Sequence, residues 1–517
     1  MLKDKSPQSS FYGSYLYDKI IPSDHLLRKI NAVVNFSFVH ELVKDRYTPD
    51  FGRPAEDPEF MLRLCLLQYL YGDSDREVVA NARLNLAYKY FLGLAIDEEV
   101  PDDSTISVFR AHRLGEEKFR EVFQAIVKQC IEKGLVTGKK QIIDSTHIIA
   151  DMAVTSLSGL IKTCRHNVLK SVADQDVKIA DKLGIKDLKV IKQDKFTRVE
   201  EGLEKEISEA EKLLDGVTSE LKAKKLEATT ELQRHLNCLE KAVADRAEDA
   251  KDRLVSPIDP DARAGKKEHK NWVGYKGHMV IEETSEIITA IETTPANTDD
   301  GGQLKPLLCQ QEQTHDIIPQ ELSGDKGYDR GANLEYLEDK DITGYISLST
   351  KMNKEGKDLF TVDDFIYDEA NETLTCPGGC TAPYRRFATF RNDKHQRNGD
   401  IFQFSPSQCN ACELKSLCHK SNRGRSVSIS FYDGCYRKMK QRMESEEGKE
   451  VYRRRYKIEH KVADLARWCG MRRCRYRGLC RAKIHTLLSA IAANIKRMAK
   501  LLWEIPEIPP PKPAMAT

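Results

Sequence analysis

Long hydrophobic runs are missing from the sequence, and its opening residues do not predict a secretory leader. None of its apolar stretches approaches the roughly 18–20 residues that a membrane-spanning helix needs. The opening segment, MLKDKSPQSS, lacks the apolar core of a signal peptide. We therefore expect a soluble intracellular protein with no membrane contact. In such a compartment, the 14 cysteines argue against a disulfide framework.

An excess of one charge is also missing. The chain carries 82 basic and 80 acidic residues, a formal net charge of +2, so the overall balance neither favours nor excludes a nucleic-acid partner. The distribution is more informative, because residues 452–500 are rich in lysine and arginine and contain only two acids, Glu459 and Asp464. Clustered arginines can neutralise phosphates, which predicts DNA binding by this segment. The arginines expected to contact DNA are Arg467, Arg472, Arg473, Arg475 and Arg477.

Two stretches have a helical pattern. Residues 57–135 contain several short helix patterns, and the interpretations of a helix-turn-helix relative or a packing domain without DNA contact both remain open. Residues 165–253 are highly charged, with apolar residues at intervals of three and four. That spacing is typical of a coiled coil or a helical hairpin, and we interpret the segment as a helical insertion.

Three acids stand at positions suited to metal chemistry. Asp144 interrupts an isoleucine-rich strand pattern. Asp325 comes directly after a short predicted strand and lies between Gly324 and Gly327, and Glu459 lies on a basic predicted helix. Each has a simpler explanation: Asp144 and Asp325 as turn aspartates, and Glu459 as a surface ion pair. Together they supply the carboxylate oxygens that two Mg²⁺ ions need to cut a phosphodiester bond.

The segments IIDSTHIIAD, SGDKGYDR and YRRRYKIEHKVADLARW resemble the signature of bacterial insertion-sequence transposases of the DDE type. The third is the most specific. That family's pattern is tyrosine, two residues, arginine, three residues, glutamate, six residues and lysine. Tyr452, Arg455 and Glu459 match it, whereas Ala466 stands at the last position and Arg467 follows one place later.

The resemblance implies an α/β fold with an RNase H-like mixed sheet flanked by helices. It implies catalysis by Asp144, Asp325 and Glu459 with two Mg²⁺ or Mn²⁺ ions. Tyr452 and Arg455 would contact DNA from the same helix face as the glutamate. The implied partners are double-stranded DNA, as terminal inverted repeats and target, and further copies in a dimer or higher assembly at the bacterial nucleoid.

The resemblance also guides the expected domain organisation. The predicted segments are an N-terminal helical domain (1–136), a catalytic core (137–164 and 254–362), the helical insertion (165–253), a Cys-rich β insertion (363–433), the basic C-terminal helices of the core (434–503) and a disordered proline-rich tail (504–517).

A cysteine cluster lies inside the predicted β insertion. Its spacing, C-x3-C, then C-x2-C-x5-C, resembles a zinc ribbon. The expected ligands of a structural Zn²⁺ are Cys376, Cys409, Cys412 and Cys418, with Cys380 or His419 as substitutes. Reduced cysteines without metal are the alternative.

The main hypothesis is therefore a cut-and-paste DNA transposase. Two alternatives remain open at this point: a DNA-binding relative without catalysis, and a metal-dependent nuclease that cuts without strand transfer.

Overall fold

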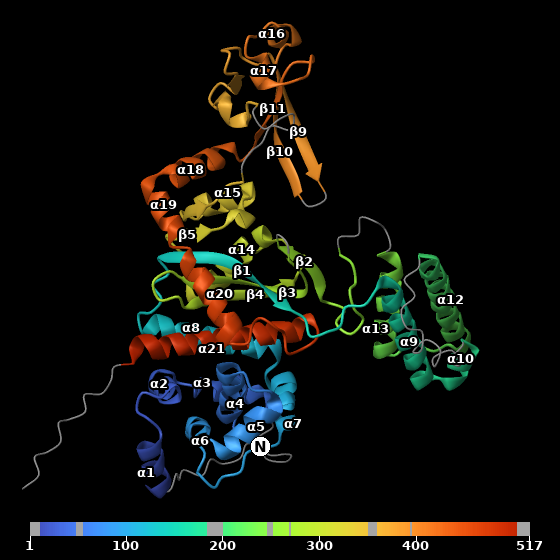
Figure 1. The fold of residues 1–517 in the computed structure, drawn as a ribbon, viewed down its shortest axis with the longest axis vertical. Coiled ribbons are helices and arrows are strands. Elements are labelled where there is room, and N and C mark those ends of the chain that lie inside the picture. Colours follow the sequence, from blue (N-terminus) through green and yellow to red (C-terminus); the bar gives the residue numbers. More distant parts are fainter. Residues whose placement is uncertain are drawn as a thin grey trace, which may run out of the picture.

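The computed structural model describes residues 11–47, 55–183, 200–245, 252–267, 270–349, 359–392 and 395–503. The predicted disordered tail at 504–517 lies outside these residues. None of the described helices combines the length and apolar character needed to cross a bilayer. The described chain forms a central body, a helical arm to one side and a small β-rich unit at one end (Figure 1).

A mixed sheet forms the centre of the body. Its strands follow the order β2-β3-β1-β5-β6, and β4 pairs with β3. β1 is antiparallel to β3 and parallel to β5, and β3 and β4 form an antiparallel hairpin. This is the expected RNase H-like sheet. Its strands are β1 (Lys140–Ile149), β2 (Arg263–Lys267), β3 (Lys270–Glu282), β4 (Ile288–Pro295), β5 (Glu321–Gly324) and β6 (Thr343–Ile346).

Both faces of the sheet are covered by apolar packing. Successive side chains of a strand alternate between faces, so Ile142 and Ile143 enter two different cores. The core containing Ile142 continues into α8 and α21, and that containing Ile143 continues into α14, α15 and α18. Burial on both faces explains the isoleucine-rich sequence of β1. These helices are α8 (Gly115–Glu132), α14 (Leu304–His315, preceded by the 3₁₀ turn η4, Asp300–Gln303), α15 (Gly331–Asp339), α18 (Asp433–Glu444) and α21 (Leu479–Leu502).

The remaining N-terminal helices pack beneath the sheet, with α21 between them and the sheet (Figure 1). Local signals define their ends: Asp57 caps α4, and Ser74 forms a capping box with Glu77 on α5. The helices are α1 (Phe11–Ile20), α2 (Leu26–Val33), α3 (Phe38–Leu42), η1 (Lys44–Arg46), α4 (Pro58–Tyr71), α5 (Asp75–Leu84), α6 (Leu86–Leu92), α7 (Asp103–Val108) and the π-helical turn η2 (Phe109–Leu114).

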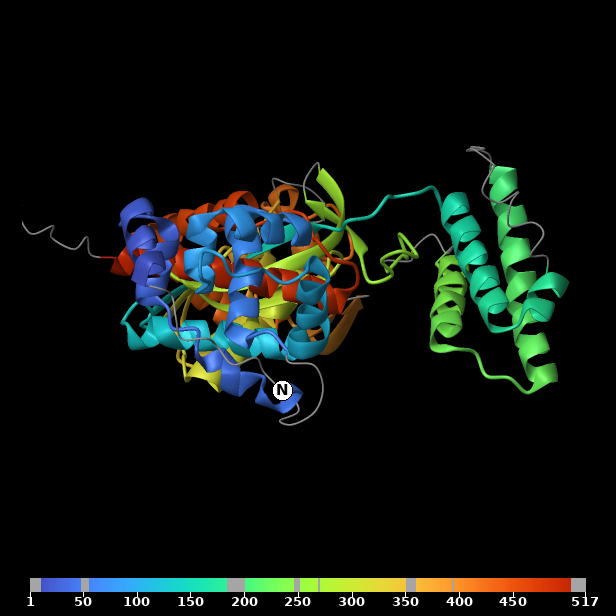
Figure 2. The ribbon, with the colours of Figure 1, turned by 90° about the horizontal axis from the view of Figure 1, so that it is seen from below.

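The helical arm has a hydrophobic core of its own. Figures 1 and 2 both show it standing away from the body, connected by extended chain. Its first helix begins at Leu157, earlier than the 165 expected from the sequence. The described helices are α9 (Leu157–Gln175), α10 (Val177–Lys182), α12 (Glu200–Lys224) and α13 (Thr230–Ala244).

The β-rich unit lies between β6 and α18 in the chain. A three-stranded antiparallel sheet, in the order β11-β10-β9, and a two-stranded ribbon of β7 and β8 form it. Its elements are η6 (Val362–Asp364), β7 (Ile366–Asp368), β8 (Thr373–Thr375), β9 (Tyr384–Asn392), β10 (His395–Gln403), α16 (Pro406–Asn410), α17 (Lys415–Cys418) and β11 (Ser426–Ser430).

The buried helix α21 provides hydrogen-bond partners for main-chain groups of the edge strand β4. Asn494 is fully buried, and its side-chain amide accepts from Ile288 N and donates to Ile288 O, each at 2.9 Å. An asparagine thus takes the place of a neighbouring strand at the start of β4. The apolar residues of this helix, among them Leu488 and Ile491, are buried in the core.

Asn494→Ala is expected to destabilise the fold. It leaves a buried N–H and a buried C=O of Ile288 unpaired, at a cost of about 2–4 kcal/mol. Chemical denaturation measures the change in the free energy of unfolding. Lys500→Ala, at an exposed position of the same helix, is the control and should change it by less than about 0.5 kcal/mol. An unchanged midpoint for Asn494→Ala would contradict this role.

Candidate active site

Strand pairing brings Asp144 and Asp325 together. β1 and β5 are parallel, and Ile142 aligns with Ser323. Two residues further along, the same register sets Asp144 beside Asp325, which follows the last residue of β5. Side chains at matching positions of neighbouring strands share a face, so both carboxylates lie on the same side of the sheet.

A tight turn holds Asp325. Its Oδ1 accepts from Gly327 N at 2.9 Å, capping the short helix η5 (Lys326–Tyr328). A Cβ on Gly324 would stand 2.9 Å from Ile346 Cδ1 and 3.0 Å from Ile143 Cγ2, so a larger residue would force these buried side chains to move. Asp325 is thus a turn aspartate, as the simpler explanation has it. The same turn also places it next to Asp144.

The third acid, Glu459, lies on α20 (Tyr456–Trp468), which packs against β1. Ile458 and Leu465 are buried, whereas Glu459 is exposed. Arg455, four residues earlier, forms an ion pair from Nη2 to Asp144 Oδ2 at 3.1 Å. Residues four apart in a helix lie on the same face. Glu459 therefore lies about one helical turn after Arg455, the residue that contacts Asp144.

The signature tyrosine is on a different helix. Tyr452 belongs to α19 (Glu446–Arg453), and a turn at 454–455 separates it from α20. The expectation that Tyr452 and Glu459 share the face of one helix is therefore wrong. Tyr452 nevertheless stays beside the arginine, because its hydroxyl accepts from Arg455 Nη1 at 3.3 Å.

The donors present have the right chemistry for a hard divalent cation, since the predicted set consists of carboxylates, with Asp144 on β1 and Asp325 directly after the adjoining strand β5. In the described parts of the chain, however, no three His, Cys, Asp or Glu side chains are arranged as a finished metal site. In this arrangement the guanidinium of Arg455 supplies the positive charge next to Asp144.

Sequence reasoning missed Tyr328, three residues after Asp325. The ring is fully buried, and burial is the main cause that raises the pKa of its hydroxyl well above the usual value. The negative charges of Asp144, Asp300 and Asp325 raise it further. The hydroxyl has no hydrogen-bond partner among the described residues. The available sequence signal was the Gly327–Tyr328 pair directly after the aspartate.

The predicted DNA-binding arginines divide into two groups. Arg467, Arg473 and Arg477 are exposed, and Arg477 Nε also donates to Asp151 O at 3.2 Å. Arg472 and Arg475 make contacts inside the protein: Arg472 Nη1 lies 3.0 Å from His147 Nδ1, and Arg475 donates to the main-chain carbonyls of Asp73 and Gln68. Burial lowers the pKa of Arg472.

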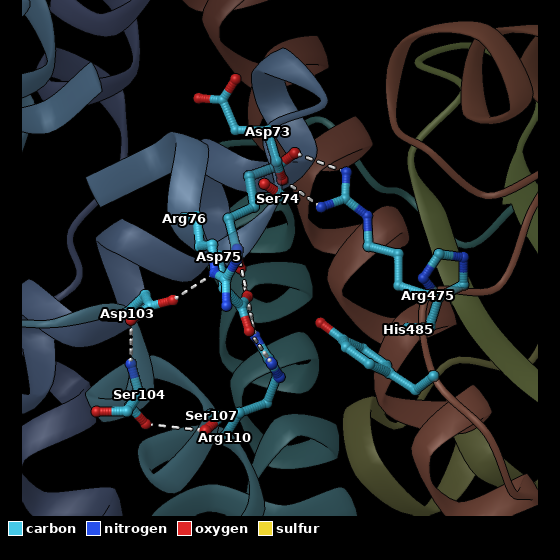
Figure 3. A network of polar contacts seen from close by, with 12 residues as sticks. Asp73, Ser74, Asp75, Arg76, Asp103, Ser104, Ser107, Arg110, Arg475 and His485 are labelled. Carbon is cyan, nitrogen blue, oxygen red and sulfur yellow. Dashed lines mark hydrogen bonds and ion pairs between the residues drawn. The ribbon is translucent and has the colours of Figure 1, made fainter. Parts of the chain in front are cut away.

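Arg475 belongs to a polar network between the N-terminal helices and the C-terminal segment (Figure 3). Its guanidinium also lies over the ring of Tyr69, 4.8 Å from the centroid. Nearby, Arg110 forms a two-pronged ion pair with Asp75 at 3.0 and 2.8 Å. The buried His485 Nδ1 lies 3.0 Å from Tyr69 Oη. These contacts fix the N-terminal helices to the body.

The cysteine cluster gathers in the β-rich unit. Cys376 and Cys380 form one turn, and Cys380 N donates to Cys376 Sγ at 3.3 Å. Cys409, Cys412 and Cys418 lie on or next to α16 and α17, and all five cysteines line one small cavity together with His419. Burial raises the pKa of Cys418 to about 11, and the neighbouring cysteines add to the shift. Among the described residues, these cysteines and His419 are likewise not arranged as a complete metal site.

Comparison with protein families agrees with this architecture. Residues 15–112 match the family described as Transposase domain (DUF772), and residues 243–495 match the family described as Transposase DDE domain. The chain belongs to the DDE transposases of insertion sequences. The second match includes Asp325 and Glu459, and the first covers most of the helices beneath the sheet. No curated protein matches the chain.

The buried histidine predicts a pH dependence for this transposase. Burial lowers the pKa of His485 to about 3, whereas the unfolded chain has a value of about 6.5. Between these values the unfolded state binds a proton that the folded state excludes, so stability falls as pH drops. From pH 6.5 to 5 the loss attributable to His485 is about 2 kcal/mol.

Denaturation of the wild type and His485→Gln at both pH values checks this. The glutamine is uncharged throughout and should remove this part of the pH dependence. Identical losses in both proteins would contradict the assignment.

Proposed function

We propose that this chain is the enzyme that cuts DNA at the terminal inverted repeats of its insertion sequence and joins the freed ends to a target. The observation that carries the proposal is the register that sets Asp144 beside Asp325, with α20, the helix that carries Glu459, packed against the same strand. We propose these three acids as the ligands of two Mg²⁺ or Mn²⁺ ions. When bound, such ions activate an attacking oxygen and stabilise the leaving oxygen.

The residues of the chain have distinct parts in this proposal. Asp144 is held rigidly by a strand buried on both faces, and Asp325 by its capped turn. Arg455 forms an ion pair with Asp144. A scissile phosphate would offer this arginine a second anionic partner, and an arginine fork matches phosphate oxygens well. Tyr452, bonded to Arg455, would contact the same stretch of backbone.

The exposed arginines Arg467, Arg473 and Arg477 are proposed to bind the DNA duplex. Arg472 and Arg475 would act indirectly, since their contacts hold the segment that carries the others. The signature of Tyr452, Arg455 and Glu459 supports the branch of the family with that pattern. A dimer or higher assembly on DNA is part of the proposal.

A carboxylate-to-amide series tests the catalytic assignment. Asp144→Asn, Asp325→Asn and Glu459→Gln should each lower cleavage about a thousandfold or more, because losing metal-dependent stabilisation costs several kcal/mol. DNA binding should remain. The substrate is a labelled fragment spanning the flanks of the gene, assayed with Mg²⁺ by gel for cut and joined products.

Asp464→Asn, an exposed acid on the same helix as Glu459, is the matched control and should cut normally. Cut product without joined product would indicate a nuclease, and neither product from the wild type would indicate an inactive relative. If Glu459→Gln cuts at the wild-type rate, the third ligand is wrong.

We further propose that Cys376, Cys409, Cys412 and Cys418 hold one structural Zn²⁺. Two observations support this proposal. The four cysteines line one cavity, and a Cβ built on Gly378 would lie 3.4 Å from Cys412 Sγ and 3.7 Å from Cys376 Sγ, so both sulfurs approach the same glycine. Thiolates are the donors that tetrahedral zinc sites use.

Elemental analysis of the purified chain should find about one zinc per chain. Cys409→Ser combined with Cys412→Ser should remove it, while Cys480→Ser, at an exposed cysteine elsewhere, should retain it. Protein purified without zinc, folded and with unchanged unfolding on metal addition, would contradict the site.

A further inference from the structure

A fourth carboxylate, Asp300, lies against the turn that carries Asp325. A Cβ built on Gly327 would stand 2.9 Å from Asp325 Oδ1 and 3.7 Å from Asp300 Oδ2, so the two acids border the same glycine. Asp300 opens η4, shortly after the end of β4. β4 runs in the same direction as β1 and β5, because each of β4 and β1 is antiparallel to β3. Their carboxyl ends therefore meet at one edge of the sheet.

The neighbours of Asp300 leave one of its oxygens directed at this turn. Lys276 Nζ donates to Asp300 Oδ1 at 2.9 Å and to Thr298 O at 2.8 Å. His278 Nδ1 lies 3.7 Å from the same Oδ1. Asp300 Oδ2 accepts no hydrogen bond from the described residues, and it is the oxygen that approaches Gly327.

Two buried polar groups around these acids lack partners in the described structure. Tyr328 is fully buried, and its hydroxyl makes no hydrogen bond to the described residues. Besides burial, the negative charges of Asp144, Asp300 and Asp325 raise the pKa of this hydroxyl. His278 is also fully buried, with Nδ1 unbonded and facing Asp300. Buried polar groups without partners are rare in folded proteins, and here they surround carboxylates. A hydrated divalent cation would satisfy such a set, since Mg²⁺ keeps several of its waters when proteins bind it.

We infer that Asp300 is a further ligand of the active site, sharing a divalent cation with Asp325 through its Oδ2. Lys276 and His278 are positioning residues that turn the carboxylate toward the ion. The inference rests on the proposed function, because it places the cation in the same site. The competing explanation is a structural ion pair in which Asp300 serves only to neutralise Lys276.

Binding of Mn²⁺ to the full-length chain separates these explanations without an activity assay. The spectroscopic signal of free Mn²⁺, measured by electron paramagnetic resonance, falls as the ion binds and gives an affinity. Asp300→Asn should weaken Mn²⁺ binding about tenfold or more, as expected for loss of a group at a metal site. Asp325→Asn should do the same. Asp299→Asn is the matched control, since the adjacent Asp299 pairs with Arg330 instead, and it should bind Mn²⁺ like the wild type.

A double variant guards against loss of folding. Asp300→Asn leaves Lys276 without its ion pair, whereas Lys276→Gln with Asp300→Asn replaces the pair by two uncharged amides. Its Mn²⁺ affinity should be as low as that of Asp300→Asn, with wild-type thermal unfolding. Wild-type affinity in the double variant, with weakened binding in Asp325→Asn, would overturn the role of Asp300 and leave the proposed function standing. Equal affinity in the wild type and Asp325→Asn would overturn the proposed metal site itself.

Discussion

The parallel pairing of β1 with β5 is the constraint on which the rest of the site depends. Its register sets Asp144 beside Asp325 although 180 residues of chain separate them. A slip of one residue would turn every side chain of β1 to the other face. The alternation of Ile142 and Ile143 between two cores opposes such a slip. The same apolar packing that stabilises the sheet therefore determines which carboxylates meet.

The site also requires α20 to be held in a fixed position. The C-terminal segment, which includes α20 and α21, is anchored on both sides. α21 is buried between the sheet and the N-terminal helices, and its polar residues, such as Asn494 and His485, are bonded to the elements on either side. Arg475 ties the loop between α20 and α21 to the N-terminal helices. The family matches divide the chain into two parts, but the contacts join these parts into one frame around the site.

Local patterns in the sequence were enough to predict the strand that carries Asp144, the short strand before Asp325 and the helical insertion, whereas the mixed sheet was expected from the family resemblance. Glu459 required the resemblance, because an exposed acid on a basic helix carries no signal of its own. Charge alone could not reveal that Arg475 turns inward, since its acceptors are main-chain carbonyls of α4 and of the loop that follows it, far away in the sequence. The break after Tyr452 and the approach of Asp300 to Asp325 likewise depend on non-local packing. The helical arm was predicted as an insertion, but its separation from the body was not.

The central claim is that Asp144 and Asp325 bind one divalent cation between them. Anomalous diffraction from crystals of the transposase grown with a DNA end and Mn²⁺ tests it most directly. The account predicts a manganese peak in contact with carboxylate oxygens of both residues, with Arg455 moved away from Asp144. Manganese bound elsewhere, with the ion pair between Arg455 and Asp144 intact beside the DNA, would contradict the account.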